Sequence, residues 1–66
     1  MLAYENKLIA RHIMSVHGLR AQAVVAERIA EARLAGDRAG LDRWQNVRAA
    51  IGELRQTGLR QVLASA

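Results

Sequence analysis

Apolar side chains in the second half of the chain recur every three or four residues, and this spacing constrains the fold more than any other feature. An α-helix turns through about 100° per residue, so residues three and four apart share a face. The spacing predicts a helix over about residues 38–56, with Asp37 as its N-cap. The repeat is carried by Leu41, Trp44, Val47, Ile51 and Leu54.

Similar spacing predicts two more helices, over about residues 2–16 and 20–35. Each is followed by a glycine, Gly18 or Gly36, at the position where a left-handed residue commonly ends a helix. We interpret Gly58 in the same way, as the end of the third helix.

Short connections between helices of similar length favour antiparallel neighbours. We therefore predict an all-α fold, a small three-helix bundle, in one domain that spans residues 1–66. A short apolar tail, residues 59–66, is expected to follow it. The first helix should bury Val16, and the second should present a wide, alanine-rich apolar face. Its two rows are Leu19, Ala23, Ala26, Ala30 and Leu34, and beside them Val25, Ile29 and Ala32.

The composition agrees with helices and limits the core. The sequence has no Phe and no Pro, and residues that favour strands do not alternate over a useful length. A chain of 66 residues buries only about 60% of the surface that its unfolded form exposes. It also has no cysteine, and so no disulfide. Small domains of this kind often gain stability by self-association or by docking on a partner.

No combination of residues indicates catalysis or a cofactor. His12 and His17 are five positions apart, which turns them about 140° from each other on a helix. Glu27 and Glu31 share a helix face with Arg28, and we expect Arg28 to pair with Glu31 in solvent. No Ser or Cys nucleophile lies near a histidine, and the glycines form no phosphate-binding loop. We expect no enzyme, no cofactor and no metal site.

The chain contains no apolar stretch near the roughly 20 residues that span a bilayer. Its first residues carry neither a basic region nor an apolar signal core, so we expect a cytoplasmic protein. A helix lying on a membrane surface is a weaker alternative, because the polar face of the third helix is not rich in lysine.

Apolar residues in excess of what a thin core can hide favour a protein that acts through contacts. We expect a protein–protein interaction or structural module, which binds a protein partner or a second copy of itself. Trp44 should mainly anchor the core, with part of its ring exposed. The candidate partner contacts are Leu41, Trp44, Leu59 and Leu63.

Nucleic-acid binding is the alternative function. The net charge is +4, and the turn at Gly36 between two helices is compatible with a helix-turn-helix motif. The third helix would then contact phosphates and bases. Its candidate residues are Arg43, Gln45, Asn46 and Arg48.

An ordered set of short motifs runs through residues 10 to 56. The set comprises His17-Gly18, Ala21, Ala26-Glu27-Arg28, Gly36-Asp37, Gly40, Trp44, Ala50-Ile51 and Leu54. This outline resembles a group of small bacterial helical proteins that have no assigned function. The resemblance implies a compact helical domain, and it implies no activity and no site residue. The chain departs from the group after the His-Gly pair, where it has Leu19-Arg20 in place of acidic residues.

Overall fold

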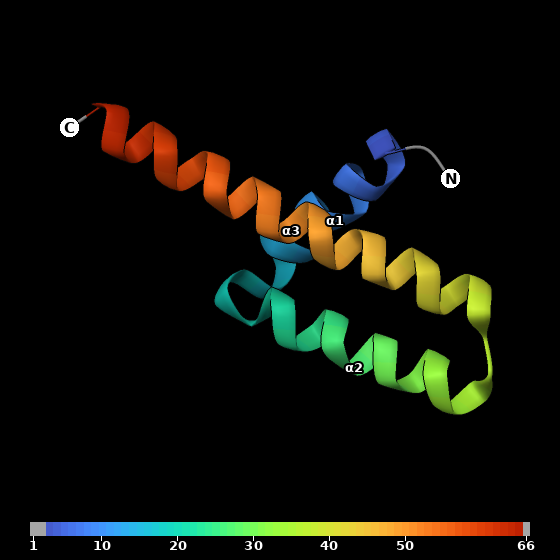
Figure 1. Ribbon diagram of the computed structural model, residues 1–66. Helices are drawn as coiled ribbons and strands as arrows, with labels where there is room; N and C mark the ends of the chain where they lie inside the picture. Colours follow the sequence, from blue (N-terminus) through green and yellow to red (C-terminus); the bar gives the residue numbers. More distant parts are fainter. Residues whose placement is uncertain (1–2, 66) are drawn as a thin grey trace.

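The computed structural model describes residues 3–65, and all of these except Gly36 and Asp37 are helical. The elements are α1 (Ala3–His17), a short 3-10 helix η1 (Gly18–Arg20), α2 (Ala21–Ala35) and α3 (Arg38–Ser65) (Figure 1). The prediction of an all-α fold is confirmed.

The predicted arrangement, a three-helix bundle with a separate tail, is wrong. The described part of the chain forms two stretches of helical residues, 3–35 and 38–65, and within the first of them the left-handed Gly18 ends α1 and η1 leads directly into α2. The long helix α3 packs against both α1 and α2, which contact each other little. In Figure 1, α2 runs beside α3 in the opposite direction and α1 crosses behind α3. The fold is therefore two shorter helices on one long one.

Two of the three predicted glycine stops are confirmed. Gly18 has a φ of 59° and Gly36 a φ of 70°, in the left-handed region where a side chain would be strained. Gly58, in contrast, lies inside α3, which continues to Ser65. The residues after Gly58 are good helix formers such as Leu, Arg and Gln, and one interior glycine costs a helix only about 1 kcal/mol.

The turn between α2 and α3 is fixed by hydrogen bonds at both helix ends. The backbone N–H of Asp37 donates to the carbonyl of Ala32 at 2.9 Å, and that of Gly36 donates to Arg33 at 3.2 Å. These bonds satisfy the last carbonyls of α2 in a Schellman-type ending. The side chain of Asp37 accepts a hydrogen bond from the backbone N–H of Gly40 at 2.9 Å. The predicted N-cap of α3 is confirmed.

The core lies where α3 meets the other two helices, and small residues let the helices approach. Its largest fully buried side chains are Val25, Val47 and Ile51. The other buried apolar residues of the described chain are Ala10, Ile13, Ala21, Ile29, Ala32 and Ala50. Trp44 is partly buried and packs against this cluster together with Ile9, Met14, Leu41 and Leu54.

Half of the predicted apolar face of α2 is exposed. The row of Val25, Ile29 and Ala32 is buried, whereas the row from Leu19 to Leu34 faces solvent. The reason is that α3 is the main neighbour of α2, so only one side of α2 is covered. The expectation that Val16 is buried is wrong as well, because 61% of it is exposed.

Candidate interaction surface

The C-terminal part of α3 extends past the rest of the molecule, toward the end marked C in Figure 1. All residues from 56 to 64 are exposed. Three of them are large and apolar: Leu59 is 60% exposed, Val62 65% and Leu63 67%. Earlier turns of the same helix bury Val47 and Ile51 completely. Val62 lies within about 20° of Ile51 around the helix, whereas Leu59 and Leu63 lie about 80° and 120° away from it. Most of the exposed apolar surface of the extension therefore faces a different direction from the buried side of α3.

Arg55 lies at the boundary between the covered and exposed parts of α3. Its Nη2 donates to the backbone carbonyl of Gly18 at 3.3 Å and to that of Leu19 at 3.4 Å. These two bonds attach η1 to α3 and place a cation beside the carbonyls that follow α1. Leu19 is 94% exposed at this boundary. The exposed part of α3 thus begins next to another uncovered leucine.

The four predicted partner contacts do not form one surface. Leu41 and Trp44 are partly buried and pack against the core, while Leu59 and Leu63 lie on the extension. Trp44 and Leu59 are separated by about 22 Å along the helix axis, at 1.5 Å per residue. Only the second pair is positioned as a free apolar surface. Whether any of the four contacts a partner stays a prediction.

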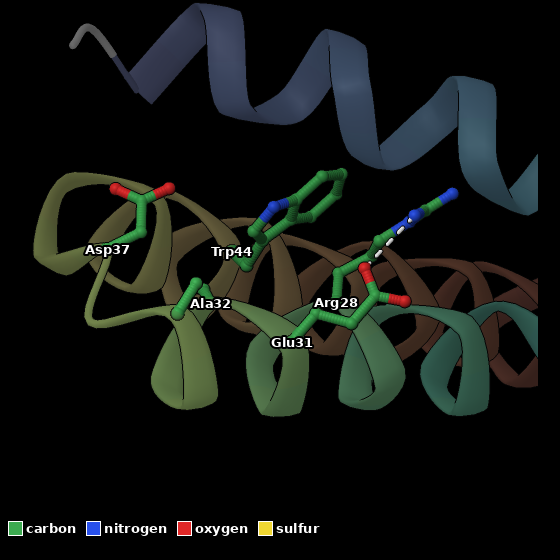
Figure 2. A pocket seen from close by; sticks show the side chains of 6 residues that line it. Arg28, Glu31, Ala32, Asp37 and Trp44 are labelled. Carbon is green, nitrogen blue, oxygen red and sulfur yellow. Dashed lines mark hydrogen bonds and ion pairs between the residues drawn. The ribbon is translucent and has the colours of Figure 1, made fainter.

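The exposed edge of Trp44 borders a pocket of about 380 Å³ at the α2–α3 turn. Figure 2 shows Trp44 between Asp37 and the ion pair of Arg28 with Glu31. That predicted pair is confirmed, with 3.3 Å between Arg28 Nη1 and Glu31 Oε2, but both side chains are more than half exposed. Pairs of this kind contribute little to stability. The pocket lacks the buried, convergent polar groups of a typical small-molecule site.

Sequence reasoning missed the buried polar residue of the core, Asn6. Only 7% of it is exposed, and its side-chain oxygen has no hydrogen-bond partner in the described part of the protein. It borders a pocket of about 190 Å³ between α1 and α3, together with Lys7, Asn46 and Glu53. The burial of Asn6 could have been predicted from its spacing, because it lies four residues before Ala10 and seven before Ile13, on the buried side of α1.

The four candidate nucleic-acid contacts are all exposed on α3, but they do not converge. Arg43 and Asn46 lie on one flank of the helix, and Gln45 and Arg48 lie on the other, about 160° away. A recognition helix needs its contacting side chains on one face. The structure therefore places the four candidate residues in two separate pairs, and they do not form a single surface for nucleic acid.

The described residues hold no group of three or more His, Cys, Asp or Glu side chains that could bind a metal ion. None of the helices described is long and apolar enough to cross a membrane. Comparison of the chain with family models, curated proteins and solved structures returned no match. The resemblance drawn from the sequence stays a prediction.

Proposed function

We propose that this protein is a small cytoplasmic interaction module without catalytic activity, which binds protein through the exposed end of α3. Three neighbouring apolar side chains on that end carry the proposal: Leu59, Val62 and Leu63 are each at least 60% exposed. Covering the remaining surface of each would stabilise a complex by about 1–2 kcal/mol. Isolated exposed leucines are common on proteins, whereas a contiguous group on a projecting helix is typical of a binding surface.

The test compares the proteins that bind the natural chain with those that bind a variant lacking the apolar group. Leu59→Ser with Leu63→Ser removes most of the apolar surface of the extension. Leu34→Ser is the matched control, because Leu34 is 90% exposed on the outer side of α2. Tagged versions of the three chains are used to capture proteins from cells of the native host. Any partner found is then purified and titrated calorimetrically against each chain.

The proposal predicts a partner that the double variant loses and the Leu34→Ser chain retains. Circular dichroism should show equal helix content in all three chains, because the substituted side chains are largely in solvent. If every captured protein binds the double variant as well as the natural chain, the end of α3 is not the binding surface. Binding of nucleic acid that weakens steeply with added salt would favour the alternative function.

A further inference from the structure

The protein exposes more surface than a compact monomer of its size. Its accessible surface is 5056 Å² and its mass is 7.3 kDa. A typical folded monomer of that mass exposes about 4,200 Å². The radius of gyration is 12.9 Å, whereas a compact chain of this length has about 10.8 Å. The surplus, roughly 900 Å², is close to the 800 Å² or so that each partner buries in a standard protein–protein interface.

Four residues form a line along the side of α3 that holds the exposed leucines. We call Gly52, Gln56, Leu59 and Leu63 the α3 seam. They are spaced four, three and four residues apart and lie within about 60° of one another around the helix. This is the spacing of helices that pair side by side. A side chain added at Gly52 would meet nothing within 4 Å, so the seam has an open notch at its start.

The seam has the same spacing in either chain direction. If a second copy of α3 lies antiparallel to the first, Gly52 of each copy faces Leu63 of the other. Gln56 of each then faces Leu59. A leucine thus lies opposite a glycine at both ends, which is the large-to-small matching that close helix packing requires. Leu19, which is exposed beside Arg55, would lie at the edge of this contact.

We infer that the partner of the α3 seam is a second copy of this chain, bound antiparallel about a two-fold axis near residues 57 and 58. This inference rests on the proposed function and names its partner. A two-fold pair covers the same patch on both copies, so one kind of contact covers the exposed leucines of each. Each copy carries a net charge of +4, so the two repel each other at low salt. Added salt should therefore strengthen the dimer.

Two glycine variants test the seam without removing any side chain. Gly52→Leu fills the notch that the partner's Leu63 would occupy. Gly58→Leu is the matched control, because Gly58 also lies in α3, also has open space beside it, and points about 130° away from the middle of the seam. Both changes favour the helix, so loss of pairing in one alone does not reflect unfolding.

Sedimentation velocity from about 10 µM to about 1 mM covers the expected affinity, because interfaces of this size begin in the micromolar range. The natural chain, Gly58→Leu and Leu34→Ser should form dimers. Gly52→Leu and the Leu59→Ser, Leu63→Ser double variant should dimerise at least about 100-fold more weakly. A dimer that withstands Gly52→Leu, or one that Leu34→Ser abolishes, would overturn the inference.

The orientation can be measured with one spin label per chain, because the sequence contains no cysteine. Gln45→Cys places the label on an exposed position of α3, on the same side of the helix as the seam but about two turns before Gly52. Antiparallel pairing predicts about 40 Å between the two labels, at 1.5 Å of rise per residue. A separation below about 20 Å would indicate parallel helices and refute the arrangement.

The two proposals fail in different ways. A strict monomer that still binds a different protein through Leu59 and Leu63 would refute the second copy and leave the proposed function standing. A strict monomer without any partner that depends on these leucines would refute both. A dimer that weakens as salt is added contradicts the repulsion between like-charged copies, and with it the inferred packing.

Discussion

Replacing Gly40 by alanine should not stabilise α3, although the same change stabilises most helices. The backbone N–H of Gly40 donates to the Asp37 carboxylate that caps the helix. A Cβ atom at position 40 would lie 2.8 Å from Cγ of Asp37 and closer still to one carboxylate oxygen. The carboxylate must therefore rotate away, and the cap is weakened. The helix gains propensity and loses its cap at the same time.

The two effects are similar in size, so their balance can be tested by a double-mutant cycle. Alanine in place of an interior glycine adds about 1 kcal/mol to the free energy of unfolding, and loss of an aspartate cap removes about 1 kcal/mol. Gly40→Ala alone should leave the stability unchanged or lower it slightly. In the Asp37→Ala chain, where no carboxylate is in the way, Gly40→Ala should add about 1 kcal/mol. The coupling between the two sites is therefore about 1 kcal/mol.

Urea unfolding, followed by circular dichroism and by the fluorescence of Trp44, measures these differences at a fixed low protein concentration. A chain of 66 residues has a total stability of about 3–10 kcal/mol, so 1 kcal/mol is resolved easily. Gly58→Ala is the control, since nothing lies near that position, and it should stabilise the chain. If Gly40→Ala stabilises the natural chain as much as Gly58→Ala does, the argument about the cap is wrong.

Three further changes test the packing and the turns. Ile51→Ala empties a fully buried site and should lower the unfolding free energy by about 3 kcal/mol in urea titrations, whereas Leu34→Ala at an exposed site should change it by less than about 0.5 kcal/mol. Gly36→Ala forces a side chain into the left-handed region, so it should lower the free energy of unfolding by about 1–2 kcal/mol and lower the melting temperature. An unchanged melting temperature would show that the turn adopts another conformation without loss of stability. Arg55→Met removes two hydrogen bonds to η1, so it should lower the free energy of unfolding by about 1 kcal/mol and speed amide hydrogen exchange at Gly18–Arg20. Unchanged exchange at these residues would mean that Arg55 does not hold η1 in place.

The features that were predicted correctly depend on local chemistry. The left-handed glycines at 18 and 36, the Asp37 cap and the Arg28–Glu31 pair each involve residues within a few positions of one another. The stripe of Val47 and Ile51 on α3 also follows from helical spacing alone. Local preference and final structure agree at these positions, so the sequence was sufficient.

The errors arise where the outcome depends on how many neighbours a helix has. Leu34 and Val25 both lie on apolar rows of α2, but α3 covers only one of the rows. Spacing alone does not distinguish an apolar side that meets a helix from one that meets water. The same limit applies to the candidate site, where Leu41 and Leu63 were grouped together although only Leu63 is largely exposed. Gly58 resembles a helix end in the sequence because glycine gives similar local signals at a helix end and inside a helix.

Because α1 and α2 hardly touch, the order in which the chain is made matters for when it can fold. The ribosome releases both short helices before α3, the one element against which either can bury its apolar side. Until then, core side chains such as Ile13 and Val25 remain exposed to water. Isolated helices of 15 residues are only marginally stable. Stable folding of the nascent chain should therefore require the middle of α3 to emerge, and a ribosome stalled shortly after the α2–α3 turn should hold helices that are only marginally formed.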